Sequence, residues 1–438
     1  MNPRGRFVAL VLFGTFGVIP LATADWPTFR GADRTAVSKE TDLLEKWPEG
    51  GPALLWKAEG FGRGYTSLAI ANGRGFLVGD GISDVDDKDE YLICFDIREG
   101  KRLWAVKAGS PWTDGQPAWQ SSRSTPTVDG DRVYVLTAAG DLICCNVANG
   151  QEHWRKNLKK DFEGKKGDSW GYSESVLIDG KQLVCTPGGE KTTMVALDKL
   201  TGDTVWTTVR EADRGAGHAS IVISEIGGVR LYVQTTRSGA LGVRANDGKL
   251  LWSYTLPTDM KIAAVIPTPI VRNDLVFFTN GYESGGALLK QTLDGTNGVT
   301  IKEIYPINKE LKNKHGGVVL VGDHLFGDTD DKGIPFCADM ATGEIKWNKT
   351  RPSGGGSIAM AAADGHLYLH FANGTMVLAK AEPDAYVEVG SFKIPGSGER
   401  PSWSHPVILD GKLYLRENNT LLCYDIRDKS PAAKSSGN

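Results

Sequence analysis

The 438-residue chain carries 50 basic and 53 acidic side chains, so its formal net charge is only −3. This balance gives no electrostatic reason to expect nucleic acid as a partner. Hydrophobic residues make up 40%, and no apolar run after the N-terminus reaches the roughly 18 residues of a membrane-spanning helix. A polytopic membrane protein and a mostly disordered chain are therefore excluded. The 54 glycines indicate many turns.

Residues 1–24 have the pattern of an export signal. Arg4 and Arg6 precede an apolar run at residues 7–21, and small residues follow at positions 22 and 24. We expect cleavage after Ala24, because this apolar run is too short to anchor the chain comfortably in a bilayer. The first cysteine is Cys94, so the signal offers no lipid-attachment cysteine. The sequence predicts a periplasmic or secreted protein with no transmembrane segment.

The six cysteines are predicted to be free and buried, although the expected compartment permits disulfides. Four of them fill one slot of a repeat, two residues before Asp or Asn in an apolar strand: Cys94, Cys144, Cys337 and Cys423. Ala196 fills this slot in another copy, which indicates a small buried side chain. Equivalent positions of successive repeats are not expected to meet. The adjacent Cys144 and Cys145 point to opposite faces of a strand, which disfavours a bond between them.

A phrase recurs about every 48 residues: an apolar strand, Asp or Asn, three residues, Gly, three residues and Trp. The Asp or Asn side chain bonds turn amides, and Gly supplies the positive φ that closes the turn. The Trp side chain is predicted to wedge between neighbouring sheets. These structural tryptophans are Trp56, Trp104, Trp154, Trp206, Trp252 and Trp347.

Each repeat contains about four short strands with alternating apolar positions, which is typical of a β-propeller and not of helical repeats. Eight inner strands are predicted to start near Ser67, Thr125, Ser175, Ser220, Thr268, Gly317, Ser357 and Pro406. The eighth copy ends before its Gly and Trp, and the unpaired strand at residues 53–57 is predicted to complete it. Joining the two ends removes free strand edges.

The predicted fold is therefore all-β. It is a single eight-bladed β-propeller of four-stranded blades over residues 25–428, with a disordered tail at 429–438. Blades five and seven lack the Trp, so the blade boundaries around 270–310 and 355–395 are the least well defined.

The phrase at residues 197–206, Leu-Asp-Lys-Leu-Thr-Gly-Asp-Thr-Val-Trp, resembles the tryptophan-docking motif of pyrroloquinoline quinone (PQQ)-like propeller repeats. Residues 25–31, Asp-Trp-Pro-Thr-Phe-Arg-Gly, resemble the opening of exported members of that superfamily. The resemblance covers essentially all of residues 25–428. It implies the propeller fold, but the superfamily includes quinoprotein alcohol and sugar dehydrogenases as well as the non-enzymatic BamB-type assembly factor.

Residues just ahead of the inner strands are predicted to gather at one mouth of the central channel. They are Trp119, Arg123, Trp170, Tyr172, Glu174, His218, His315, Trp403 and His405, with Lys261 some way ahead of the fifth inner strand. Aromatic rings together with Arg, Glu and His at a concave opening favour a pocket for a polar or anionic, planar or sugar-like ligand. The alternative is that these groups cap blade edges and bond neighbouring loops.

Catalytic residues and metal ligands cannot be assigned from motifs. The chain has no Cys-x-x-Cys-His run for haem c and no Gly-x-Ser-x-Gly elbow, so Ser-His-Asp catalysis has no support in the sequence. The acidic segments 84–90 and 328–333 lack the Gly and distal Glu of an EF-hand loop. Both segments are expected to be solvated hairpin loops.

The favoured function is a non-catalytic scaffold of the cell envelope, a monomer that binds an envelope protein or a small polar ligand. The missing lipid-attachment cysteine is a departure from the BamB-type factor. The alternative implied by the resemblance is a PQQ-dependent alcohol or sugar dehydrogenase, in which calcium polarises the quinone. In such enzymes a vicinal disulfide packs on PQQ, but Cys144 and Cys145 lie inside the repeated phrase. A third possibility is carbohydrate binding or hydrolysis, for which no carboxylate pair is identifiable.

Overall fold

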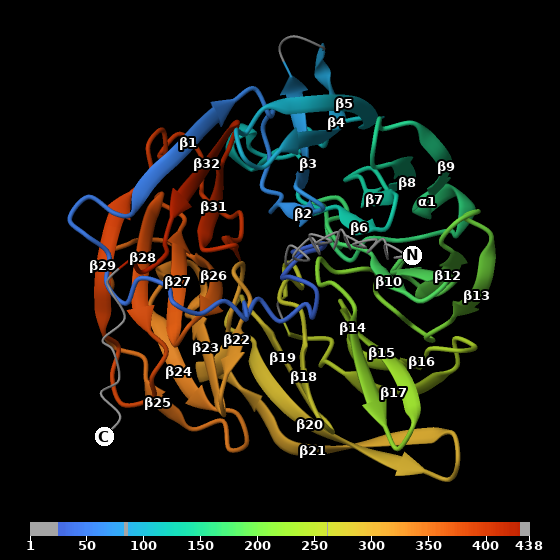
Figure 1. The fold of residues 1–438 in the computed structure, drawn as a ribbon. Coiled ribbons are helices and arrows are strands. Elements are labelled where there is room, and N and C mark those ends of the chain that lie inside the picture. Colours follow the sequence, from blue (N-terminus) through green and yellow to red (C-terminus); the bar gives the residue numbers. More distant parts are fainter. Residues whose placement is uncertain (1–24, 83–85, 261, 430–438) are drawn as a thin grey trace, which may run out of the picture.

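The computed structural model describes residues 25–82, 86–260 and 262–429. The predicted signal peptide, Lys261, residues 83–85 of the first acidic loop and residues 430–438 of the predicted tail lie outside this part of the chain. The described residues form eight four-stranded antiparallel sheets arranged as blades around a central channel (Figure 1). The predicted eight-bladed β-propeller is therefore confirmed, and each inner strand starts within two residues of its predicted position.

The strands are numbered along the chain, and β1 (Ala53–Glu59) precedes the first complete blade. Blade 1 contains β2 (Ala69–Ala71), β3 (Arg74–Ile82), β4 (Asp86–Asp96) and β5 (Arg102–Gly109). Blade 2 contains β6 (Thr127–Asp129), β7 (Arg132–Leu136), β8 (Asp141–Asn146) and β9 (Glu152–Asn157). Blade 3 contains β10 (Leu177–Asp179), β11 (Gln182–Cys185), β12 (Met194–Asp198) and β13 (Thr204–Thr208). Blade 4 contains β14 (Val222–Ile226), β15 (Val229–Thr236), β16 (Gly239–Arg244) and β17 (Leu250–Thr255).

The second half of the ring repeats this plan. Blade 5 contains β18 (Ile270–Arg272), β19 (Leu275–Asn280), β20 (Gly285–Asp294) and β21 (Gly298–Asn308). Blade 6 contains β22 (Val319–Val321), β23 (His324–Asp328), β24 (Pro335–Asp339) and β25 (Ile345–Trp347). Blade 7 contains β26 (Ile358–Ala363), β27 (His366–Phe371), β28 (Thr375–Lys380) and β29 (Glu388–Lys393). Blade 8 contains β30 (Val407–Leu409), β31 (Lys412–Glu417), β32 (Thr420–Asp425) and, as its outer strand, β1.

The two ends of the ring meet in blade 8, as predicted. The β1 strand pairs antiparallel with β32, with Leu54 opposite Tyr424 and Trp56 opposite Cys423. An outer strand from the N-terminal side therefore covers an edge that the C-terminal strands would otherwise expose. None of the helices in the described chain is long and apolar enough to cross a bilayer.

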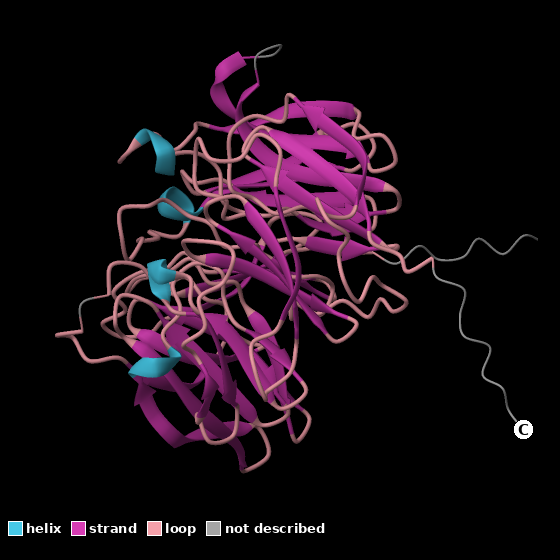
Figure 2. Cartoon of the chain, turned by 90° about the vertical axis from the view of Figure 1, so that its left-hand side faces the viewer, coloured by secondary structure: helices cyan, strands magenta, loops and turns pink. Residues whose placement is uncertain are grey.

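Among the residues described, the helices are single turns in the loops. These turns are η1 (Pro117–Trp119), α1 (Leu158–Asp161), η2 (Lys309–Leu311) and η3 (Asp330–Lys332). They lie on one face of the disc (Figure 2). We call this the mouth face, because it carries the loops that run from the outer strand of one blade to the inner strand of the next.

The small residue of the repeated slot lies directly across from the repeat's Trp. Cross-strand pairs join Cys94 to Trp104 and Cys144 to Trp154, and Gly242 faces Trp252 in the same way. A Cβ on Gly242 would lie 2.2 Å from the Trp252 ring, so a large side chain there would displace the indole. The slot is small because the opposite strand fills the space.

Each Trp side chain also reaches the next blade. Trp104 Nε1 donates to the Val147 carbonyl at 3.2 Å, and its ring covers Gly150. Where blade 5 lacks the Trp, Tyr305 takes the place, since its hydroxyl donates to Met340 and its ring covers Gly343. In blade 7 Gly390 occupies this position, and Trp47 of the N-terminal segment packs against it. The six tryptophans named from the sequence all make an Nε1 hydrogen bond of this kind.

The core is divided among the blade interfaces. The buried apolar side chains of the described residues form eight clusters, each between two neighbouring blades. Cys144 belongs to the cluster between blades 2 and 3, and Cys145 to the one between blades 1 and 2. All six cysteines are buried and free, which confirms the prediction from the repeat.

A belt of hydroxyl groups lines the start of the inner strands. The Thr125 hydroxyl accepts from the Ser67 amide, and the Ser175 hydroxyl from the Thr125 amide, at 3.0 and 3.1 Å. Ser220 and Thr268 continue the series at 3.0 and 3.2 Å. The inner strands of blades 2 to 5 therefore each satisfy a buried amide of the preceding blade, which gives a physical reason for Ser or Thr at this point of the repeat.

The N-terminal segment, residues 25–52, crosses the central channel (Figure 1). Trp26 exchanges two backbone hydrogen bonds of 2.8 Å with Ile70 in blade 1, and Ser38 bonds Ala362 in blade 7. Between them, buried Arg34 donates to the carbonyls of Ser175, Val176 and Ile221. The segment thus spans the ring and closes the channel from within, a feature that the repeat pattern did not predict.

Candidate functional site

A cavity of about 350 Å³ opens at the mouth face, and we call it the mouth pocket. Seven of the nine predicted mouth residues line it: Trp119, Arg123, Trp170, His218, His315, Trp403 and His405. They come from loops ahead of different inner strands and converge because the blades are arranged in a ring. The positional argument from the sequence therefore placed these seven residues at one cavity.

Tyr172 and Glu174 do not line the pocket. The Tyr172 hydroxyl donates to the Pro187 carbonyl at 2.9 Å, and Glu174 accepts hydrogen bonds from the amide and hydroxyl of Thr186. Burial raises the pKa of Glu174 to about 8. The chain alternates here, so that Ser173 and Ser175 face the cavity while Tyr172 and Glu174 face the protein. Proximity to the inner strand was the right signal, but the side-chain direction was missed.

The N-terminal segment forms part of the pocket lining. Phe29 packs edge-to-face on His405 at 4.9 Å, and buried Arg30 donates to the carbonyls of Thr35 and Val318. Burial lowers the pKa of Arg30 to about 10, so it stays charged at neutral pH. Gly317 replaces the hydroxyl residue of the belt here, because a Cβ would lie 2.6 Å from the Arg30 guanidinium.

Aromatic rings make up much of the pocket wall. Trp119 and Trp170 meet at a centroid distance of 5.6 Å, at a steep angle. Trp403 lies between two rings, stacked on His315 at 4.4 Å and tilted against Tyr65 at 4.8 Å. The indole Nε1 of Trp403 is buried without a hydrogen-bond partner. Flat faces and a spare donor are features that suit a ring-bearing ligand.

The guanidinium of Arg123 is held by backbone and rings. It donates to the carbonyls of Trp119 and Ser121 and lies 4.8 Å from the Trp112 ring centroid. Burial lowers the pKa of Arg123 to about 10, which leaves it charged at neutral pH. None of the salt bridges found in the described chain joins it to a carboxylate, so its charge is available to an anion in the pocket.

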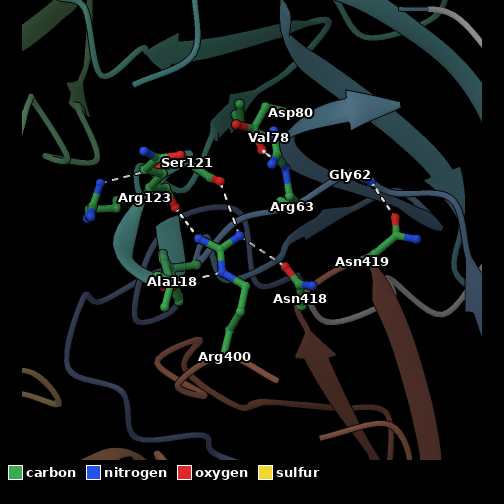
Figure 3. A network of polar contacts seen from close by, with 12 residues as sticks. Gly62, Arg63, Val78, Asp80, Ala118, Ser121, Arg123, Arg400, Asn418 and Asn419 are labelled. Carbon is green, nitrogen blue, oxygen red and sulfur yellow. Dashed lines mark hydrogen bonds and ion pairs between the residues drawn. The ribbon is translucent and has the colours of Figure 1, made fainter. Parts of the chain in front are cut away.

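Arg400 links the loops of blades 8 and 2 by hydrogen bonds beside the pocket. Its guanidinium donates to Ala118, Gln120 and Ser121, and also to the Asn418 side chain (Figure 3). It also lies over the Tyr65 ring at 5.0 Å. Arg400 was missed from the sequence, because it sits in a Gly- and Ser-rich loop with no recurring position in the repeat.

The three histidines of the pocket are neutral at pH 7. Burial lowers the pKa of His315 and of His405 to about 3, and that of His218 to about 4. The Nδ1 atom of His405 is buried without a partner, and Nδ1 of His315 lies 3.2 Å from the Ser357 hydroxyl. Neutral imidazoles act here as hydrogen-bonding groups rather than as cations.

His218 belongs to a hydrogen-bonded chain with Ser173 and Asp168. Its Nδ1 lies 2.5 Å from the Ser173 Oγ, and its Nε2 lies 3.0 Å from the Asp168 Oδ2. Burial opposes ionisation of Asp168, but His218 and Lys166 together hold its pKa well below the usual range. Burial lowers the pKa of Lys166 to about 8. The ionised carboxylate of Asp168 is therefore hydrogen-bonded to the neutral imidazole of His218.

The residues around the pocket do not fit a calcium-bound quinone. Calcium takes six to eight oxygen ligands, whereas the carboxylate in the pocket lining is that of Asp331, which is exposed and paired with Lys314 at 2.6 Å. No group of three or more His, Cys, Asp and Glu side chains in the described chain is arranged to hold a metal ion. Cys144 and Cys145, both in β8, are free and buried.

Each of the two acidic segments has one buried carboxyl group, which was not expected. Glu90 is only 1% exposed within β4, where burial raises its pKa to about 8. Asp328 is fully buried in β23, accepts from Asn313 at 2.7 Å, and has its pKa raised well above the usual value by burial. The expectation of solvated loops was wrong for these two residues, because the strands extend further than the charge pattern indicated.

Fold and site together define an eight-bladed propeller with a pocket lined by aromatic rings at one mouth of its channel. The family model described as "Outer membrane protein assembly factor BamB" matches residues 88–349, more than half of the chain. The chain belongs to this family of PQQ-like propellers.

Individual proteins are only distantly similar. The outer membrane protein assembly factor BamB of Nitrosomonas eutropha is 23% identical over 298 residues, which are 67% of each chain. That of Kangiella koreensis is 28% identical over 123 residues, so the match covers 26% of each chain. A europium-containing methanol dehydrogenase superposes with a TM-score of 0.64 at 12% identity, covering 90% of this chain and 89% of that one. This last likeness is one of fold.

Proposed function

We propose that the protein is a binding scaffold of the cell envelope that serves outer membrane protein assembly, and that the mouth pocket holds the group it recognises. Membership of the BamB family supports the role in assembly. The expected export signal supports a periplasmic location. The observation that carries the binding role is the pocket itself, in which aromatic rings and an unpaired guanidinium converge on one cavity.

The lining favours a ring-bearing, anionic group. The faces of Trp119 and Trp170 offer apolar contact to an aromatic or sugar ring. Arg123 and Arg30 supply positive charge, and the hydrogen bonds that they make are to backbone carbonyls. A carboxylate, sulfate or phosphate next to the ring would meet these charges in a buried setting, where such hydrogen bonds are strong. The ligand is either a free small molecule or such a group on a partner protein.

The test is gene deletion in the source bacterium with complementation. Deletion should lower the amounts of outer membrane proteins measured by quantitative mass spectrometry, and the wild-type gene should restore them. Variants Trp119→Ala and Arg123→Gln should restore them poorly at equal protein level. Leu200→Ala, at a 52% exposed side chain outside the pocket, is the matched control and should restore them fully. Unchanged outer membrane proteins after deletion would refute the assembly role, and full rescue by both pocket variants would refute the pocket's part in it.

A further inference from the structure

The arrangement of Asp168, His218 and Ser173 goes beyond what ligand binding needs. Two hydrogen bonds link the three side chains in a row, with the imidazole in the middle. Ser173 and His218 line the mouth pocket, whereas the Asp168 side chain is 4% exposed behind them. The order is carboxylate, imidazole, hydroxyl and then open cavity.

The charge of Asp168 sets the tautomer of His218. An ionised carboxylate only accepts hydrogen bonds, so the proton of the neutral imidazole sits on Nε2, next to Asp168. Nδ1 therefore carries the lone pair, and the Ser173 Oγ–H donates to it. This is the logic of a serine–histidine–carboxylate relay with the two ring nitrogens exchanged. The imidazole is in the state that a general base requires.

The surrounding backbone holds the relay in place. Asp168 Oδ1 accepts from the Trp170 amide at 2.9 Å, which fixes the carboxylate. The loop of Asp168 is bound to the loop of His218, since the Gly167 amide donates to Ala216 at 2.9 Å and Lys166 Nζ donates to Gly217 at 2.7 Å. The geometry is therefore pre-organised by two loops that belong to different blades.

From this geometry we propose that Ser173 is the nucleophile of a hydrolytic acyl transfer, and that the mouth pocket cleaves a carboxylic ester of a ring-bearing compound. The Ser173 Oγ forms a bond to the acyl carbon while its proton passes to Nδ1 of His218. The carbon–oxygen bond to the alcohol then breaks, and the alcohol leaves with that proton. A water molecule adds to the acyl-serine by the reverse route, which releases the carboxylic acid and restores the serine.

The pocket supplies two further features that suit this reaction, aromatic rings and a positive charge. Trp170 and Trp119 offer flat contact for the ring. Arg123 lines the pocket, and its positive charge favours the oxyanion that develops on the acyl group. Asp168 remains ionised throughout and is a positioning residue, since it acts through His218. The activity uses the same pocket as the proposed scaffold function but does not depend on an assembly partner.

The test is labelling of the purified chain with a fluorescent fluorophosphonate, followed by peptide mapping. We expect one adduct, at Ser173, that is lost in Ser173→Ala and forms at least 100-fold more slowly in His218→Gln. Ser253→Ala is the matched control, because Ser253 is an exposed serine on β17 that does not line the pocket. It should label like wild type. Circular dichroism and melting temperature establish that each variant is folded.

Hydrolysis of p-nitrophenyl benzoate gives the second readout. The hydrolysis rates of the folded wild type and variants should follow the same order as their labelling rates. Asp168→Asn should alter the pH profile of hydrolysis, which loss of a merely structural carboxylate would not do. Absence of an adduct on folded wild-type protein at saturating probe, or equal labelling of Ser173→Ala and wild type, would overturn the proposal. Either result would leave the complementation test of the scaffold function unaffected.

Discussion

The contact between Trp206 and Gly248 allows a sharp test of how the blades are held together. Gly248 has φ +72°, and a Cβ there would lie 2.5 Å from the Trp206 ring. Gly248→Ala therefore carries two costs. The left-handed backbone costs roughly 1–2 kcal/mol for a residue with a Cβ. Displacing the indole also weakens its Nε1 bond to Ala245, now 3.1 Å, and its packing, for about 2 kcal/mol more.

Gly73→Ala is the matched control, because Gly73 has φ +73° and open space around its Cβ position. The free energy of unfolding, measured by urea denaturation, should fall about 2 kcal/mol further for Gly248→Ala than for Gly73→Ala. In a Trp206→Ala background the two substitutions should cost the same, since the ring that clashes is gone. Equal costs in the wild-type background, or an excess that persists without Trp206, would refute the role assigned to this contact.

Three further outcomes are expected. Arg34→Met should cost roughly 3 kcal/mol, because it removes the donor that three buried carbonyls share. It should also speed limited proteolysis within residues 25–52, whereas Arg98→Met at the surface should do neither. Burial lowers the pKa of His405 to about 3 in the folded state, below the unfolded value near 6.5. As the pH falls below about 6.5 the unfolded chain takes up a proton that the folded protein does not, so the protein loses stability. Between pH 7.5 and 5 the free energy of unfolding should therefore fall by about 2 kcal/mol less in His405→Gln than in wild type. An equal fall in both proteins would contradict this. Titration with PQQ, followed by tryptophan fluorescence, should show no dependence on calcium; tight binding that requires calcium would instead favour the dehydrogenase alternative.

The repeat made most of the fold predictable. The Gly-to-Trp phrase encodes a local turn and a contact with the next blade, and both recur at fixed spacing, so eight blades and the closing strand could be counted. Blades 5 and 7 were harder, because Tyr305 and Gly390 stand at the Trp position and the phrase no longer stands out. The path of the N-terminal segment could not be predicted, since it depends on single contacts such as those of Arg34 with distant carbonyls.

The site was predictable only as a location. Position ahead of the inner strands placed Trp119, Arg123 and five further residues at one cavity. Side-chain direction within a loop is set by tertiary contacts, which is why Tyr172 and Glu174 were included although they face away. The relay of Asp168, His218 and Ser173 has no local motif, because its members come from two loops that only the ring of blades brings together.

Photo-cross-linking at the mouth tests the central claim most directly. Trp119 is replaced by p-benzoylphenylalanine in cells of the source bacterium, and Leu200, exposed outside the pocket, is replaced in a parallel strain as the control. The account predicts that light joins the protein to a component of outer membrane protein assembly, or to a small ring-bearing anion, from position 119 and not from position 200. A cross-link from position 200 alone, or none from position 119 in a strain with normal outer membrane proteins, would contradict it.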